Sequence, residues 1–567
     1  MNIYNEIRHL IIEVIKNNIE GINQSTLDLI TCEQPKNLKF GDLSSNALMI
    51  LGKKNKIDVK SIEDVVISEL NSKKLFEKVT YIKPGFINFT LKKSIWYDIM
   101  IHILKHNSFG FRNIGLNKKV ILEFISANPT GPLHVGHLRG AVFGDVLANL
   151  MQKSGYKVAK EYYVNDIGNQ IEVLYLTVKY HIENKLNKEH LKQPEEMYHG
   201  EYLKYIADEI IANEDYKKDK NLIKKIIIDK VLKLIRRDLN NLGIVFDNFI
   251  SEKNIHEKGM LNDVIDNLNK KNLLFTGYLE KPKGIKDKDW KPKKQLIFKS
   301  SSYGDDNDRA IKKNDGNWTY FASDIAYHHY KVSRGFNEII NVWGADHAGY
   351  IKRINASLLA LGHNKITFDV KLCQIVNLLE NNKSVKMSKR SGNFILIDDI
   401  LKKIDKDVVR FFMLIRKNDA HLDFDLKKCL EETKENPIFY IQYAIARINS
   451  ANKFFTEKGL KFRGFNEKLF NKLNDNEIGL LKKLSLWPKV IENSVFYKEP
   501  HRVVYYLIDL AGLLHNYWSM GKLDIDLRVI NENDNDVTEA RLTLLNVISK
   551  VIRSGLDVLA IQPMEKM

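Results

Sequence analysis

The pattern of apolar and polar positions changes most sharply within residues 120–150. The first six, VILEFI, are apolar except for Glu123, which is typical of a strand buried in a parallel sheet. Turn residues 128–132 (NPTGP) interrupt this run, and apolar residues then recur at a four-residue spacing, the pattern of one helix face. Gly155 ends that helix, and a second apolar run begins at Lys157. The stretch therefore predicts a strand, a helix and a parallel strand joined by a right-handed crossover.

The other apolar patterns divide the chain into three parts, because 567 residues are too many for one core. An amphipathic helix opens the first part, residues 1–112, which we expect to be a small α/β domain. The second part, 113–429, contains the parallel sheet, with charged helices inserted at about 171–300, a short strand at 318–321 and a buried strand from Glu338. The third part, 430–567, reads as an all-α bundle.

The bundle is predicted from four helical patterns. The first begins at Asn436, and three later helices follow it, marked by Leu480, Leu484, Trp487 and Ile491, by Val504, Leu507, Leu510 and Leu514, and by Leu545, Ile548, Ile552 and Leu556.

Charge and cysteine content narrow the function classes. The formal net charge of +17 indicates a polyanionic partner, with tRNA, the ribosome and an anionic membrane surface all open. Nothing in the sequence reads as a membrane span, and Glu6 and Glu13 interrupt the first apolar stretch, so we expect a cytoplasmic protein. Cys32, Cys373 and Cys429 are isolated, which argues against disulfides and a cysteine zinc site.

The predicted helix start at 134–137 (HVGH) is the first candidate for chemistry. Helix N-termini present unpaired amides and partial positive charge, so an anion is expected there, with His134 and His137 as donors and Gly136 leaving room for a flat ring. Two histidines on one turn are more often packing or surface residues. However, the wider segment 127–137 (ANPTGPLHVGH) resembles the HIGH signature of class I aminoacyl-tRNA synthetases in its arginyl form. That resemblance implies a Rossmann-like catalytic domain and assigns ATP binding to Pro129, Gly131 and Gly136, and catalysis to His134 and His137.

Residues 385–393 (VKMSKRSGN) resemble the second signature of that class, KMSKS, with Arg390 in place of the final serine. Lys386 and Lys389 are expected to act on the β and γ phosphates as charge moves to the leaving pyrophosphate, and Met387 and Ser388 to contact ATP. The order of the two signatures, about 250 residues apart, is that of the family.

A nucleoside is expected where a buried strand ends near Gly344. Ligands of open parallel sheets collect beyond the carboxyl ends of the strands, so Gly344, Asp346 and His347 are candidates for holding adenine and ribose. A metal site at Asp346 and His347 is less favoured, because no third ligand is spaced with them.

Candidates for the amino acid come from the same resemblance. Tyr320 and Asp324 resemble the tyrosine and aspartate that arginyl-tRNA synthetases place around a guanidinium, and Glu123 and Asn128 match further arginine-contacting positions. A buried carboxylate receives the planar guanidinium through two hydrogen bonds, which lysine does not match. The alternative is that Asp324 is only a helix N-cap.

The two end domains also carry family patterns. Segments starting at Asn37 (NLKFGDLSSNALMILGKK) and Tyr81 (YIKPGFINFTL) resemble the domain that contacts the tRNA elbow; the alternative is a small domain with a structural glycine turn. The lysine-rich segment 281–299 suits either a solvated loop or single-stranded RNA. The helix from Asn436 resembles the start of the anticodon-binding domain. On it, Tyr440, Gln442, Tyr443 and Arg447 are candidate tRNA contacts, although such aromatic residues are more often core.

Taken together, the motifs imply an arginyl-tRNA synthetase that uses ATP with Mg²⁺, L-arginine and tRNA, works as a monomer and has no protein-bound metal, in particular no zinc. The same resemblance implies that tRNA must bind before arginine is activated. Two alternatives remain: a synthetase of another specificity on the same fold, and a non-catalytic RNA-binding relative. The second is disfavoured because both signatures are intact.

Overall fold

The computed structural model describes residues 1–187, 193–280, 292–380, 383–385, 395–433 and 435–567. The chain forms two compact units, and each is described by itself. One unit combines residues 1–112 with 432–567, and the other comprises residues 113–431.

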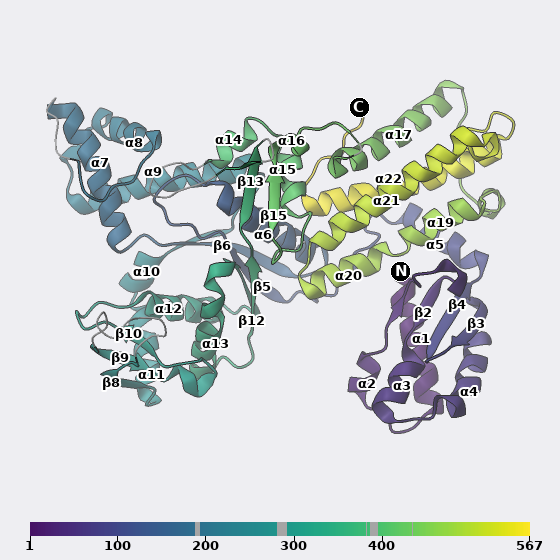
Figure 1. Ribbon diagram of the computed structural model, residues 1–567, viewed down its shortest axis with the longest axis horizontal. Helices are drawn as coiled ribbons and strands as arrows, with labels where there is room; N and C mark the ends of the chain where they lie inside the picture. Colours follow the sequence, from purple (N-terminus) through teal and green to yellow (C-terminus); the bar gives the residue numbers. More distant parts are fainter. Residues whose placement is uncertain (188–192, 281–291, 381–382, 386–394, 434) are drawn as a thin grey trace. The chain divides into compact units, whose positions relative to one another are not determined.

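A five-stranded parallel sheet lies at the centre of the second unit (Figure 1). Its order is β12-β11-β5-β6-β7, with every neighbouring pair parallel. The strands are β5 (Lys119–Phe124), β6 (Lys157–Val164), β7 (Asn248–Ser251), β11 (Glu338–Gly344) and β12 (Thr367–Cys373). Five of the six β5 residues are buried, as the apolar run predicts for a strand covered on both faces.

The predicted strand–helix–strand unit is confirmed as β5, α6 (Val135–Lys153) and β6. Helix α6 packs closely on β5, and a Cβ built at Gly144 would lie 2.3 Å from the ring of Phe124. Gly155 follows the helix with φ of +86°, a backbone conformation that favours glycine.

The segment expected to be a helical insertion is only partly helical. It begins with α7 (Asn169–Asn187), α8 (Glu201–Ala212) and α9 (Lys220–Asn241), but β7 then returns to the parallel sheet. After α10 (Glu252–Glu257) and α11 (Met260–Lys270), an antiparallel sheet of order β10-β9-β8 forms from β8 (Leu274–Tyr278), β9 (Lys294–Phe298) and β10 (Arg309–Lys312). The four β7 residues are all half-buried, so they lack the apolar alternation that would have predicted a strand.

The short strand predicted at 318–321 is wrong. Helix α12 (Tyr320–Ser333) begins there, and the Thr319 hydroxyl caps it by accepting from the Ala322 amide at 3.4 Å. Trp318 makes only an isolated bridge to Lys312. The apolar residues of this stretch instead join α11 and α13 (Ile351–Ala360) in one buried cluster.

A second, smaller sheet follows β12 in the chain. Its order is β14-β13-β15, formed by β13 (Val376–Glu380), β14 (Lys383–Ser384) and β15 (Leu422–Asp425). Three short helices complete the unit: α14 (Ile397–Leu401), α15 (Lys406–Met413) and α16 (Leu426–Cys429).

The first unit begins with the amphipathic helix that the sequence predicts, α1 (Ile3–Asn18). Its apolar face is buried at Ile3, Ile7, Ile11, Val14 and Ile15, and Leu10 is half-buried. An antiparallel sheet of order β1-β2-β4-β3 lies beside it (Figure 1). The strands are β1 (Cys32–Glu33), β2 (Leu43–Ser45), β3 (Phe76–Ile82) and β4 (Phe86–Leu91). The helices around it are α2 (Gln24–Asp28), α3 (Ala47–Asn55), α4 (Val59–Asn71) and α5 (Lys93–Lys105).

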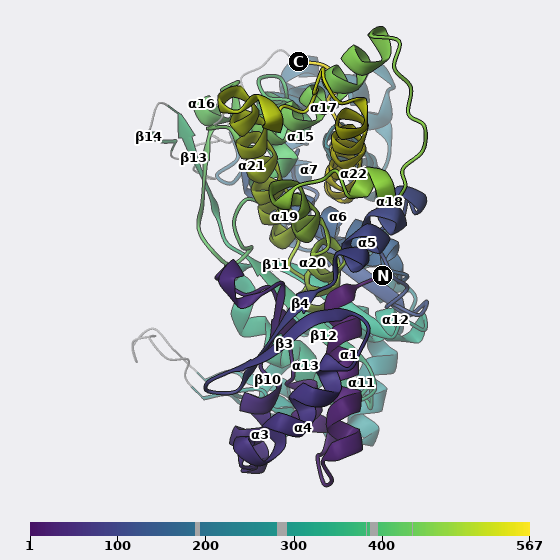
Figure 2. The same cartoon turned by 90° about the vertical axis from the view of Figure 1, so that its right-hand side faces the viewer.

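The C-terminal part of this unit is the predicted helical bundle, whose long helices α17, α21 and α22 pack together (Figure 2). The helices are α17 (Pro437–Glu457), α18 (Glu467–Phe470), α19 (Asp475–Leu484), α20 (Trp487–Tyr497), α21 (His501–Leu523) and α22 (Asn535–Leu559). The single helix predicted through Leu480 and Ile491 is in fact two helices. Helix α19 ends at Leu484, and α20 begins at Trp487 with Pro488 in its first turn. No described helix here or elsewhere is long and apolar enough to cross a bilayer.

Candidate active site

Helix α6 begins at the predicted anion-binding turn, with His134 as its N-cap residue. The Nδ1 atom of His134 accepts a hydrogen bond from the Gly136 amide (3.1 Å), and the Nδ1 atom of His137 accepts from the His134 amide (3.2 Å). A neutral imidazole that accepts at Nδ1 carries its hydrogen on Nε2. The two rings lie with centroids 3.9 Å apart, so the helix start holds two neighbouring Nε2–H donors.

The glycines of this loop have packing roles. A Cβ at Gly136 would lie 2.9 Å from the ring of His134, so a side chain there would displace a donor. A Cβ at Gly131 would lie 2.9 Å from the hydroxyl of Tyr202, which donates to the Thr130 carbonyl at 2.6 Å. Pro129 is buried in the same loop. These positions shape the loop, and Tyr202 of α8 is a brace that the sequence did not reveal.

The candidate nucleoside residues lie at the same sheet edge. Gly344 ends β11, which pairs in parallel with β5, the strand that leads into the histidine loop. Asp346 and His347 follow in a 3-10 turn, both exposed, with the Nε2 atom of His347 3.6 Å from an Asp346 carboxylate oxygen. The carboxyl ends of two neighbouring strands therefore bring these residues and the histidines to one side of the sheet.

Lys386, Met387, Ser388 and Lys389 lie outside the described residues. The chain on their C-terminal side is anchored to the histidine loop by two backbone hydrogen bonds, each 3.0 Å long. In one, the Val135 amide donates to the Ile395 carbonyl; in the other, the Ile397 amide donates to the Leu133 carbonyl. The residues after the second signature are thus bonded directly to the first.

Asp324 lies in the second turn of α12, so the alternative role of N-cap is wrong; Thr319 is the cap. Burial raises the pKa of the Asp324 carboxyl to about 8, and the nearby carboxylates of Glu252 and Glu123 contribute. Glu252 is the first residue of α10, is 2% exposed, and has a pKa raised to about 7, chiefly by burial. Within the described chain, neither carboxylate has a lysine or arginine salt-bridge partner, so this pair of carboxylates, called the acidic pocket below, is a candidate for binding a cation.

Glu123 is placed differently from these two. One oxygen of its carboxylate accepts from the Lys331 ammonium, and the other accepts from the Ser126 hydroxyl at 2.8 Å. Lys331 is fully buried and also donates to the Asn341 side chain at 3.0 Å. Glu123 is thus already neutralised beside the acidic pocket, whereas Asn128 is exposed.

Tyr320 and Tyr163 complete the surroundings of the acidic pocket. Tyr320 is 55% exposed at the start of α12, so its ring is accessible from solvent. Tyr163, on β6, stacks on Tyr327 with ring centroids 4.2 Å apart, and Glu252 and Asp324 both contribute to raising its pKa. Glu252 and Tyr163 were missed by sequence reasoning because each is a single residue without a motif, brought to Asp324 only by the fold.

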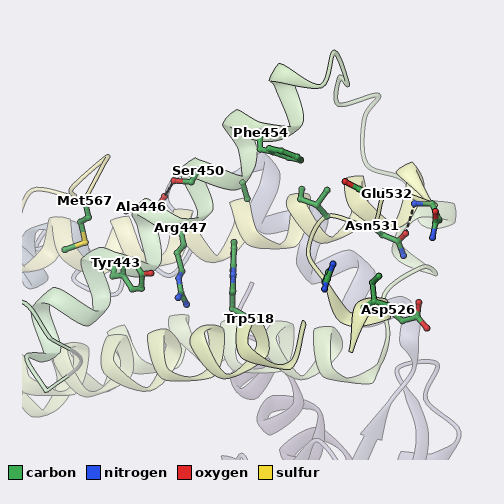
Figure 3. A pocket seen from close by; sticks show the side chains of 15 residues that line it. Tyr443, Ala446, Arg447, Ser450, Phe454, Trp518, Asp526, Asn531, Glu532 and Met567 are labelled. Carbon is green, nitrogen blue, oxygen red and sulfur yellow. Dashed lines mark hydrogen bonds between the residues drawn. The ribbon is translucent and has the colours of Figure 1, made fainter. Parts of the chain in front are cut away.

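A second candidate site is a cavity of about 600 Å³ in the helical bundle (Figure 3). Arg447 and Tyr443 from α17 and Trp518 from α21 point into it, beside the chain at 525–533. The Arg447 guanidinium lies 4.3 Å from the Tyr443 ring centroid and 5.6 Å from that of Trp518. A cation held between aromatic faces is a surface on which a planar ligand can stack.

The other two candidate contacts on α17, Tyr440 and Gln442, are not among the residues that line this cavity. Arg447 donates to Nδ1 of His515 at 3.1 Å, and Nε2 of His515 donates to the Tyr440 carbonyl at 2.9 Å. Burial lowers the pKa of His515, which keeps its ring neutral and able to accept. Gln442 is 4% exposed, and its amide binds the backbone of Gln562 and Met564, so it holds the C-terminal residues against α17; its contact with RNA stays a prediction.

Three family models match the chain. The model of the class I (R) tRNA synthetase catalytic domain matches residues 100–432, that of the DALR anticodon binding domain residues 441–567, and that of the arginyl tRNA synthetase N-terminal domain residues 6–91. The parallel sheet with its histidine turn is thus a class I tRNA synthetase catalytic domain.

Individual relatives narrow the class to one specificity. The arginine–tRNA ligase of Rickettsia typhi is 44% identical over 100% of both chains, and that of Parvibaculum lavamentivorans 41% over 97% of this chain and 96% of its own. A solved Campylobacter jejuni structure described as an arginyl tRNA synthetase is 32% identical, with a TM-score of 0.72 over 84% of this chain and 100% of its own. The Thermus thermophilus arginyl-tRNA synthetase shares the fold over 100% of both chains, with a TM-score of 0.75 at 19% identity. The chain belongs to the arginine–tRNA ligase family, whose activity is the attachment of arginine to tRNA.

Proposed function

We propose that the chain activates L-arginine with ATP to form arginyl-adenylate and then transfers arginine to the terminal ribose of its tRNA, releasing diphosphate and AMP. The observation that carries the proposal is that one edge of the sheet carries both groups: two Nε2–H donors at the helix N-terminus that follows β5, and the acidic pocket, whose Glu252 follows β7. The first suits phosphate, and the second suits a guanidinium.

In the activation step, the arginine carboxylate attacks the α-phosphate of ATP, which enters with its magnesium ion. His134 and His137 donate to the phosphates as charge develops there. Lys386 and Lys389 stabilise the leaving diphosphate, with Met387 and Ser388 beside them. Pro129, Gly131 and Gly136 shape the loop under the nucleotide, and Gly344, Asp346 and His347 hold adenine and ribose. No covalent protein intermediate is needed, because positioning and charge stabilisation supply the acceleration.

For the amino acid, Asp324 and Glu252 receive the guanidinium. Tyr320 and Asn128, both exposed, contact the same amino acid from the solvent side. Glu123 contributes indirectly: its ion pair with Lys331 prevents that ammonium from occupying the place of the substrate cation. The proposal therefore replaces Glu123 by Glu252 as the second carboxylate on the guanidinium.

For the nucleic acid, Arg447, Tyr443 and Trp518 hold an unstacked base of the tRNA anticodon loop in the bundle cavity. Tyr440 acts behind them through His515. The segment 1–112 contacts the tRNA elbow, 113–429 catalyses, and 430–567 binds the anticodon. The protein acts as a monomer in the cytoplasm, where its tRNA and ATP are found.

One experiment tests the whole proposal: aminoacylation of total tRNA with each of the twenty amino acids in turn. Arginine alone should become attached to tRNA in an ATP-dependent manner. Attachment of another amino acid would leave the class intact but refute the guanidinium assignment. Absence of charging with every amino acid, together with retained tRNA binding, would favour a non-catalytic RNA-binding protein.

A further inference from the structure

Arg139 is a buried guanidinium on α6, two residues beyond His137. The side chain is 1% exposed. Its Nη1 atom donates to the carbonyls of Ala420 (2.5 Å) and Gln374 (3.1 Å), and its Nη2 atom to those of Lys417 (2.7 Å) and Arg416 (3.5 Å). One side chain thus joins α6 to two segments more than 230 residues away in the sequence.

Both of these segments lead into the smaller sheet. Gln374 follows the last residue of β12 and stands two residues before β13. Residues 416–420 lead to β15, which pairs in parallel with β13 from Val376 opposite Leu422. Strand β13 also pairs with β14, whose end at Ser384 leads to the lysine signature. Arg139 therefore holds the beginning of β13, which precedes that signature in the chain, and the beginning of its paired strand β15, which follows it.

The same helix start holds the chain on the other side of the signature. Leu396 forms an antiparallel bridge with His134, framed by the two backbone hydrogen bonds of Leu133 and Val135. Residues 133–139 thus contact the described chain both before and after the lysine signature, and they also carry the two histidines.

Within the described chain, Arg139 has no carboxylate within salt-bridge distance; its partners are carbonyl oxygens. Burial lowers the pKa of its guanidinium, with Cys373 and Asp419 opposing that effect. Burying a cation on neutral partners is costly, and an apolar side chain of similar volume would avoid that cost. However, an apolar side chain could not replace the guanidinium, whose two Nη atoms donate hydrogen bonds to two separate segments.

We propose that Arg139 is a positioning residue for adenylate formation: it sets the distance between the histidines of α6 and the paired strands β13 and β15, which precede and follow the lysine signature in the chain. The inference rests on the proposed function, in which the histidines and lysines act on the same triphosphate. A displacement of about 1 Å at a reacting group can cost on the order of 10²-fold in rate. Transfer of arginine from adenylate to tRNA does not involve the diphosphate and should be far less sensitive.

The test uses full-length Arg139→Lys, which keeps the charge but not the fork, and Arg139→Gln, which keeps two donors without charge. Each is assayed at least 10 °C below its own melting temperature, with tRNA present. ATP–pyrophosphate exchange at saturating substrates should fall by about 10- to 100-fold. Binding of a non-hydrolysable sulfamoyl analogue of arginyl-adenylate, and single-turnover transfer from preformed adenylate, should change by less than about threefold, since neither involves the diphosphate.

The matched control is Arg410→Lys. Arg410 is also 1% exposed and bonds to the same helix through Asp145, and it donates to the Leu242 carbonyl as well. It should lose stability without a selective loss of exchange. Equal losses of exchange and transfer in the Arg139 variants, or the same selective loss in Arg410→Lys, would overturn the proposal. If both Arg139 variants keep native ATP–pyrophosphate exchange while His137→Ala is impaired, the role proposed for Arg139 is overturned and the proposed function stands. If His137→Ala itself keeps native exchange, the proposed phosphate site is refuted.

Discussion

Lys331 and Glu123 form a buried ion pair that joins α12 to β5. Removing one partner of such a pair leaves an uncompensated charge in the interior, which typically costs about 3–5 kcal/mol. We therefore expect Glu123→Gln to lower the free energy of unfolding by about that amount, measured by urea denaturation. An unchanged unfolding midpoint would show that Lys331 finds another partner or solvent.

Asp324→Asn should have the opposite effect on stability. The folded pKa of Asp324 is raised to about 8, so the folded state retains a proton that the unfolded state has already released at neutral pH. The raised pKa costs stability, and the cost grows as pH rises from about 4 to 8. The variant should melt above the parent protein at pH 8, with a smaller difference at pH 5. Equal melting temperatures at pH 8 would contradict the burial of this carboxyl.

Arginine use should fall strongly in both Asp324→Asn and Glu252→Gln. Loss of a desolvated charge-assisted interaction costs roughly 2–4 kcal/mol, here in kcat/KM for arginine. The same constant for ATP should change by less than about threefold, because the acidic pocket does not touch the phosphates. Tyr320→Phe is the mild comparison, since it keeps the ring. An unchanged arginine constant in Glu252→Gln would remove Glu252 from the site.

The pH dependence of arginine use should report the two carboxyl groups. Their pKa values, about 8 for Asp324 and about 7 for Glu252, mean that a cation binds only after protons leave. The value of kcat/KM for arginine should rise with pH, by up to about tenfold per unit while one proton must be lost, and level off above about pH 8. In Asp324→Asn, kcat/KM for arginine should level off nearer pH 7, because Glu252, with a pKa of about 7, is then the carboxyl group that must lose a proton. A flat profile between pH 6 and 8 would place the guanidinium elsewhere.

The catalytic contributions of the two histidines can be tested separately, because His134 is also the N-cap residue of α6. His137→Ala should lower adenylate formation by about 10²- to 10³-fold, the usual cost of one donor to a developing charge, without changing the tRNA dissociation constant. Lys389→Ala should do the same. His134→Asn keeps a good N-cap but loses the Nε2–H, so the variant should keep its melting temperature while losing activity. A loss of less than threefold in the rate of adenylate formation, in both His137→Ala and Lys389→Ala, would show that the phosphates bind elsewhere.

In the bundle cavity, Trp518→Ala should weaken tRNA binding by about 1–3 kcal/mol, the usual contribution of one stacked base. Tyr505→Ala is the matched control, because Tyr505 is an exposed aromatic residue of the same helix outside the cavity lining. Binding is compared at one fixed salt concentration. Equal effects of the two substitutions, or none from either, would mean that the cavity does not receive a base.

The parts predicted well from sequence are those whose pattern is local. The change from an apolar run to four-residue spacing gave the strand before residue 125 and the helix after residue 134, and the histidine motif fell at the helix start. The helices of the bundle followed from the same periodicity, except where Pro488 splits one of them. Local conformational preference and one-sided burial are properties of neighbouring residues, so they can be read in order along the chain.

What the sequence by itself determined is therefore the class of fold, the histidine turn and the family. Only the tertiary structure decided that Glu252 is near enough to Asp324 to raise its pKa, that Glu123 pairs with Lys331, and that Arg139 holds the beginnings of β13 and β15. Strand β7 illustrates the physical reason. Its half-buried residues show no apolar periodicity, yet its pairing with β6, which ends at Ser251, places the next residue, Glu252. Which buried charge meets which partner depends on contacts between distant segments, and no local pattern in the chain encodes them.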